Sequence, residues 1–358
     1  MLIKVTRSPT LFSYYWVPLF FYDEPYWVQV LNTLIELFLY ALCAYVVLVS
    51  VRIMWKVRLF HNNLVYIGTP IFALWNTLII GKLMCILYRL KWIFVDYDFG
   101  DETTLWTDNS EKMISVSSTN GFEFLIIGGF CVWHFGFSVV FGSFAVITER
   151  VIASMLIDNY ELNDSLNIPI ILSVVYQFLA ISISLALVFN KFSPIMLIAS
   201  MMFCCGISVF MYVYIKRINQ KWLRDMEDPH RTQVFTVSQR FQVRENLRAV
   251  AFGKRIVYTV MLSIATLGIG VLALFFELVP GFLLHIGENL MFCHPLFICV
   301  VTMHGHPAWK VRFRRAFPKI RFKKKPVRVE SVDVVEDSMK KFSLETDIYF
   351  KQLKDSWI

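Results

Sequence analysis

Seven long apolar stretches constrain the fold of this chain more than any other feature of its sequence. A helix that crosses a bilayer needs about 20 predominantly apolar residues. Seven windows meet this length: 27–51, 64–87, 121–147, 166–189, 194–215, 256–279 and 282–303. Charged residues make up only 17% of the chain, whereas a soluble domain carries about a quarter. The sequence therefore predicts an all-α membrane protein, a bundle of seven transmembrane helices over residues 27–303.

The distribution of lysine and arginine predicts how the bundle is oriented. If the N-terminus lies outside the cell, the inner segments carry 28 of these residues and the outer segments carry 6. Basic residues beside a span resist translocation, so we expect the N-terminus outside and the C-terminus in the cytoplasm. Residues 1–26 are then an extracellular leader that lacks a signal-peptide cleavage site. The one sequon, at Asn163, lies in the cytoplasm, where it is not glycosylated.

The segment after the seventh window is expected to lie on the cytoplasmic membrane surface. Residues 304–328 are strongly basic, and Trp309, Phe313 and Phe317 recur every four residues. This pattern is typical of a short amphipathic helix in the interface, here an eighth helix. Basic residues beside a span attract anionic lipid headgroups, so lipid is a better partner for this segment than nucleic acid. Residues 329–358 mix acids with serines and are expected to be a disordered cytoplasmic tail.

Two charged segments are candidates for a conformational switch on the inner face. At the end of the third span, Glu149 and Arg150 can pair with each other and exchange partners when the helix moves. An arginine that extends to the lipid headgroups gives the same pattern. Residues 236–239 form a capping-box pattern that begins a helix continuous with the sixth span. This helix indicates either a membrane-surface element or a docking face for a protein, and its basic face carries Arg240, Arg244 and Arg248.

Ionisable residues also gather in the outer half of the predicted spans. Buried charges are costly in a membrane and usually face the bundle interior or a water-filled cavity. We expect Lys82 to pair with Glu36 or Glu123, although the glutamates near span ends can instead lie in water at the interface. The candidate ligand pocket consists of Lys82, Glu123, His134, Glu277 and Glu288.

The sequence predicts neither an enzyme nor a cofactor or metal site. The seven cysteines lie in apolar stretches and lack metal-ligand spacing. His304 and His306 come nearest to a metal cluster, but catalytic zinc takes three protein ligands, and no third ligand has the spacing to join them. We therefore expect no catalytic residues.

Two blocks of the sequence resemble one receptor family. The first block reads VWHFGFSVVFG at 132–142, ERVIAS at 149–154 and DNYE at 158–161. The second reads SQRFQVRENLR at 238–248. Both are similar to the corresponding blocks of the nematode serpentine receptor class epsilon (Sre) chemoreceptors. The seven-span layout extends the resemblance over residues 25–320.

The resemblance implies a G-protein-coupled chemoreceptor in the plasma membrane of sensory neurons, in their cilia. It implies a small-molecule odorant or soluble chemical as ligand and a heterotrimeric G protein as partner. Glu149 and Arg150 match the acid–arginine pair that couples receptors to G proteins. The alternative is a ligand-gated channel or a transporter of inverted topology, which would expose Asn163 to glycosylation.

Overall fold

The structure is a computed structural model, and it is mostly helical. It describes residues 2–8, 11–18, 25–60, 62–93, 109, 113–156, 167–228, 235–276, 278, 286–289 and 293–317. The chain divides into two compact units, Met1–Thr302 and Met303–Ile358.

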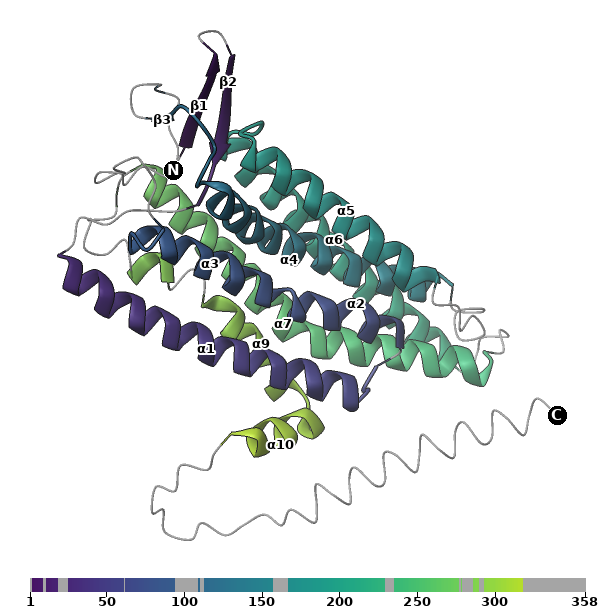
Figure 1. Cartoon of the computed structure of the whole chain (residues 1–358). Helices are drawn as coiled ribbons and strands as arrows, with labels where there is room; N and C mark the ends of the chain where they lie inside the picture. Colours follow the sequence, from purple (N-terminus) through teal and green to yellow (C-terminus); the bar gives the residue numbers. More distant parts are fainter. Residues whose placement is uncertain are drawn as a thin grey trace, which may run out of the picture. The chain divides into compact units, whose positions relative to one another are not determined.

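Long apolar helices make up most of the first unit (Figure 1). They are α1 Tyr26–Lys56, α2 Asn62–Ala73, α3 Trp75–Arg89, α4 Glu123–Met155, α5 Asn167–Val188, α6 Pro194–Glu227 and α7 Val237–Phe275. Among the residues that the structure describes, with α2 and α3 counted as one span, six helices are long and apolar enough to cross a membrane. A shorter apolar helix, 296–305, lies within α9 His294–Gly305. The prediction of a seven-helix membrane bundle is therefore confirmed.

The surface of the bundle is apolar where lipid would surround it. Phe38, Phe178 and Phe210 are each more than two-thirds exposed, a cost in water that hydrocarbon removes. Inside, α4 is the central helix, because it packs against α2, α3, α5, α6 and α7. A side chain on α4 can thus reach most of the other helices.

Two helices continue well beyond the apolar windows of the sequence. Helix α6 ends at Glu227 and α7 begins at Val237, whereas the windows end at 215 and begin at 256. The capping box predicted for 236–239 is confirmed: the backbone N–H of Thr236 donates to Gln239 Oε1 (2.8 Å), and that of Gln239 donates to Thr236 Oγ1 (3.2 Å). At 1.5 Å per residue, the 39 residues of α7 span about 58 Å, nearly twice the hydrocarbon thickness of a bilayer.

The second span is interrupted at Leu74. Pro70 lies inside α2, where its ring displaces the preceding turn and removes a backbone donor. Side chains just after the break satisfy the backbone carbonyls there: Asn76 Nδ2 donates to Ala73 O (2.9 Å) and Thr77 Oγ1 to Leu74 O (2.6 Å). Helix α2 packs against α5, and α3 packs against α4, so the break marks the point where the span leaves α5.

A small sheet covers one end of the bundle (Figure 1). Strand β1 (Leu2–Ser8) pairs antiparallel with β2 (Leu11–Trp16) and parallel with β3 (Ile114–Val116), in the order β2-β1-β3. The sequence analysis assigned residues 1–26 to an extracellular leader and predicted no strands. Three short strands, one of them distant in sequence, leave little periodic signal, and the packing beneath the sheet is what stabilises them.

Trp16 attaches the sheet to the helices. Its side chain is fully buried among apolar residues of α4, α5 and α6, and its ring centroid lies 4.8 Å from that of Trp133. Trp133 Nε1 donates to the backbone oxygen of Trp16 at 3.3 Å. The N-terminal strands thus form part of the core at this end of the bundle.

Helices α3 and α4 approach each other closely through glycine. A Cβ atom on Gly81 would lie 2.7 Å from the carbonyl oxygen of Gly128, which is possible only if the backbones separate. Small residues allow such close packing between membrane helices.

We expect Gly81→Ala to lower the free energy of unfolding by about 1–3 kcal/mol, because overpacking forces a backbone shift. Gly136→Ala is the matched control, since a Cβ there would meet nothing within 4 Å; it should be neutral or slightly stabilising. Thermal unfolding of the detergent-purified variants measures both. Equal stabilities would contradict the close approach of α3 and α4.

The second unit contains the last three residues of α9 and the short helix α10, Pro307–Ala316. His306 caps α10: burial lowers its pKa, and the neutral ring accepts the backbone N–H of Ala308 through Nδ1 at 3.3 Å. The rings of Phe313 and Phe317 lie edge to face, with centroids 4.8 Å apart. The eighth helix expected from the sequence is therefore present and ends at Ala316, two residues before Pro318.

Candidate functional site

At the end of α4 away from the sheet, a carboxylate and a guanidinium form a two-bond ion pair. Arg150 Nε and Nη2 each donate to a different oxygen of Glu149, both at 2.5 Å. Both side chains are buried, with 5% or less of each residue exposed. Two charge-assisted bonds in parallel give a defined orientation as well as energy. The guanidinium is therefore held in one position instead of extending to the headgroups.

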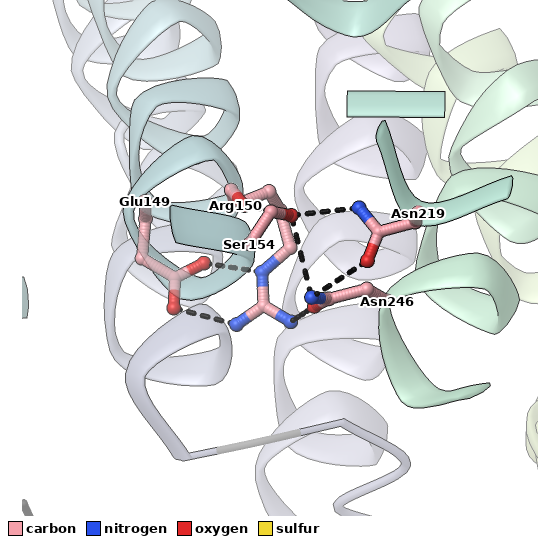
Figure 2. A network of polar contacts seen from close by, with 5 residues as sticks. All are labelled: Glu149, Arg150, Ser154, Asn219 and Asn246. Carbon is pink, nitrogen blue, oxygen red and sulfur yellow. Dashed lines mark hydrogen bonds and ion pairs between the residues drawn. The ribbon is translucent and has the colours of Figure 1, made fainter. Parts of the chain in front are cut away.

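The remaining donors of Arg150 face a second helix. Arg150 Nη1 donates to Asn246 Oδ1 on α7 at 3.2 Å (Figure 2). This hydrogen bond connects the third predicted span to the sixth. It joins residues 96 positions apart in the sequence, so it depends on the arrangement of the helices and not on local structure.

Two asparagines and a serine extend the contact to a third helix. Asn219 Nδ2 on α6 donates to Ser154 Oγ on α4 (2.8 Å), and Asn246 Nδ2 donates to both Ser154 Oγ (3.3 Å) and Asn219 Oδ1 (3.2 Å). Ser154 Oγ in turn donates to the backbone oxygen of Arg150 at 2.8 Å. We call these five residues the polar network: Glu149, Arg150, Ser154, Asn219 and Asn246.

The polar network bonds α4, α6 and α7 to one another. Asn219 and Asn246 are fully buried, and a buried amide that loses its partners carries a desolvation cost of about 1–3 kcal/mol. A small shift of α7 would break several bonds together instead of weakening each gradually.

A second charged cluster lies towards the sheet end of the bundle. Lys82 on α3 forms an ion pair with Glu288, and Arg89, the last residue of α3, forms one with Glu36 on α1. Arg89 Nη1 also lies 3.7 Å from Glu288 Oε2. All four residues are at most 4% exposed. Two cations and two anions balance, which is what allows charge to be buried in a membrane protein.

We call these four residues the outer charge cluster, after the side on which the sequence places them, and they connect α1 and α3 to the segment before α9. Tyr40, one turn after Glu36, donates its hydroxyl hydrogen to Asn289 Oδ1 at 3.2 Å. Residues 286–289 are helical. The cluster thus holds residues 286–289, which belong to the seventh predicted span. The apolar helix described in that span, 296–305, is short.

Midway between the two clusters, polar side chains of α4 and α5 meet. His134 Nε2 lies 3.0 Å from Gln177 Oε1 and 3.3 Å from Ser138 Oγ. Beside them is a hollow of about 370 Å³ between α2–α3 and α5, and Gln177 is among the residues that line it. Within the part of the chain that the structure describes, no group of three or more His, Cys, Asp or Glu could hold a metal ion.

Comparison with known proteins assigns the chain to a family. The whole chain, residues 1–358, matches the family model described as "Sre G protein-coupled chemoreceptor". Serpentine receptor class epsilon-26 of Caenorhabditis elegans is 53% identical over 359 residues, 100% of each chain. The chain belongs to the Sre family. Two more relatives from the same organism, classes epsilon-29 and epsilon-38, are 42% and 27% identical and cover 100% and 96% of this chain, and 100% and 97% of their own lengths.

Membership makes this Sre chain a multi-pass membrane protein of a chemoreceptor family. The family is one of receptors and not of enzymes. Its description implies small molecules and G proteins as the general kinds of partner.

The structure brings together some of the predicted pocket residues of this Sre chain and separates others. Lys82 and Glu288 are in contact, and the partner expected for Lys82 was wrong: the carboxylate against its ammonium is that of Glu288. Glu36 contacts Arg89. The predicted span 64–87 did not include Arg89. Glu123 is exposed in the first turn of α4, and Glu277 lies outside the described residues. The role of these side chains in binding stays a prediction.

On the face predicted to be cytoplasmic, the pair Glu149 and Arg150 is in contact. Arg240, Arg244 and Arg248 are all exposed on α7, as the four-residue spacing predicted. Between them, Gln242 and Asn246 are buried, so the buried face of this helix carries amides.

The sequence analysis missed Ser154, Asn219 and Asn246 as members of the network. Asn219 lies among lysines and arginines in a segment that looked solvated. One signal was available: Asn219 follows the buried Ile215 by four residues, and such residues share a face of a helix. A polar residue on an apolar face is a reason to look for a partner across the interface.

Proposed function

We propose that this Sre protein is a ligand-controlled switch: a small extracellular molecule changes the balance between two arrangements of α4, α6 and α7. The hydrogen bond from Arg150 on α4 to Asn246 on α7 carries the proposal, because it lies at the junction of the two blocks that resemble the family. In one arrangement the polar network is intact. In the other, α7 moves away from α4 and the network opens.

The opened arrangement offers a binding surface to a heterotrimeric G protein. Arg150 would lose Asn246 and turn towards the space between the helices, and the long basic extension of α7 would carry Arg240, Arg244 and Arg248 to the partner. A ligand can favour this state only through its higher affinity for it. Gly268 supports such motion, since a Cβ there would meet nothing within 4 Å and glycine lowers the cost of bending a helix.

The proposed setting is the plasma membrane of sensory neurons, in their cilia, with the N-terminus outside. The 28-to-6 distribution of basic residues supports this orientation, and it puts the polar network on the cytosolic side and the outer charge cluster on the extracellular side. The contact of residues 304–328 with anionic lipid stays a prediction, as does the disordered tail at 329–358.

The test is a reporter assay with a matched variant. Cells that express the receptor with a calcium or cyclic-nucleotide reporter are screened against a panel of odorants and soluble attractants. Arg150→Ala is expected to reach the surface and to lose at least nine-tenths of the response, because the opened arrangement then lacks the guanidinium that turns towards the G protein. An Arg150→Ala receptor that reaches the surface and responds as wild type would rule out the switch.

A further inference from the structure

The hollow beside the break in the second span differs from both charged clusters. Pro70, Ala73 and Thr77 line it from α2 and α3, and Ser173, Tyr176 and Gln177 line it from α5. It forms where the span leaves α5, beside Pro70 and the break at Leu74. Its volume of about 370 Å³ is in the range of small-molecule sites in proteins.

The mouth of this hollow faces hydrocarbon. Pro70 is exposed, and the residues that follow the lining positions on α5 are strongly exposed and apolar: Val174 is 62%, and Phe178 68%, exposed. Gln177 is the eleventh of the 22 residues of α5, which puts the hollow at the middle of the span. Water is scarce at this depth, so whatever fills the hollow comes from the lipid phase.

The wall of the hollow is apolar with a few polar groups. Thr77, Ser173 and Gln177 supply them, and Gln177 has a fixed orientation because its Oε1 is held 3.0 Å from His134 Nε2 on α4. Polar groups among apolar walls give orientation and specificity to a ligand. Thr77 Oγ1 already donates to Leu74 O, and Gln177 Oε1 already lies against His134. A hydroxyl or an amide can form more than one hydrogen bond, so these groups keep the capacity to bond to a polar group of an occupant.

We propose that this hollow is a binding site for a lipophilic molecule with a single hydroxyl or carbonyl group, which enters sideways from the bilayer. The alkyl part lies against Pro70, Ala73 and Tyr176, and the polar group bonds to Gln177, Ser173 or Thr77. Through Gln177 and His134 the site touches α4, the helix whose other end carries Arg150. The assignment of this molecule as the activating ligand rests on the proposed function; the binding itself does not.

Photolabelling of the full-length receptor in phosphatidylcholine nanodiscs tests the site without a G protein. The probe is an eight-carbon alcohol with a diazirine, and labelled peptides are located by mass spectrometry. Labelling is expected on residues 70–77 and 173–177, and octan-1-ol should reduce it at a concentration at least five-fold lower than an alkane of equal length. In the Gln177→Leu variant, octan-1-ol and the alkane should reduce labelling at equal concentrations.

Two variants that fill the hollow provide the comparison. Ser173→Phe and Ala73→Leu should each reduce labelling at these positions at least five-fold, whereas Val174→Phe, one residue along and facing lipid, should leave it unchanged. Equal labelling of Ser173→Phe and Val174→Phe, or equal competition by alcohol and alkane in the wild type, would overturn the site. If binding passes these tests and the wild type still drives no reporter response, the proposed function fails and the site stands.

Discussion

Replacing Lys82 with methionine is expected to lower the free energy of unfolding by about 3–5 kcal/mol, because it leaves the buried Glu288 carboxylate without its ammonium partner. The methionine fills a similar volume, so the loss reports charge and not packing. Arg89, 3.7 Å from Glu288, compensates in part, which favours the lower end of this range. Thermal unfolding in detergent, followed with a thiol-reactive dye, measures the loss of stability. The dye reports unfolding because Cys43, Cys85 and Cys299 are free thiols that are buried in the folded protein.

Two further variants separate ion pairing from other causes. Lys191→Met removes an exposed lysine between α5 and α6 and should leave the unfolding temperature nearly unchanged. Combining Lys82→Met with Glu288→Leu should recover a large part of the loss, since an apolar pair often replaces a buried ion pair without cost. If the double variant were as unstable as Lys82→Met alone, the ion pair would not be the cause.

The Asn219→Leu variant is expected to raise ligand-independent signalling about five-fold. Leucine has a similar size but breaks the bonds from α6 to Ser154 on α4 and to Asn246 on α7. Interhelical hydrogen bonds in membranes contribute roughly 0.6 kcal/mol each, so losing two shifts the balance between closed and open arrangements by about 1 kcal/mol. The basal reporter signal, divided by surface expression, measures the shift.

The neighbouring residue supplies the control for this prediction. Gln220 is exposed on α6, so Gln220→Leu makes the same kind of change one position away without touching the polar network. Its basal signal should equal that of the wild type. A rise of the same size in both variants, or in neither, would show that the network does not hold the closed arrangement.

The sequence predicted the bundle well because the membrane imposes a simple pattern. A span needs a long apolar run, and this chain has seven. The capping box at Thr236 and Gln239 was also predictable, since it depends only on residues three apart. Adjacency in the sequence suggested a contact between Glu149 and Arg150, but it left open an arginine that extends to the headgroups, and the structure has the contact.

Features that depend on tertiary contacts were not predictable in the same way. The partner of Lys82 is 206 residues away, and several glutamates were equally reasonable choices. The parallel pairing of β1 with β3 joins residues more than 100 positions apart. Asn246 lay inside a block that matched the family, but only the approach of α4 and α6 reveals what it binds.

The account depends on the polar network lying at the cytosolic end of the helices. Glycosylation of the connecting segments measures this orientation most directly. Asn163, in the segment between α4 and α5, is a natural sequon, and Glu111→Thr creates a second one at Asn109, between α3 and α4. In cells that express each form, we expect no sugar on Asn163 and a glycosidase-sensitive sugar on Asn109 of the variant. A sugar on Asn163, with none on Asn109, would put Arg150 on the extracellular side and contradict the account.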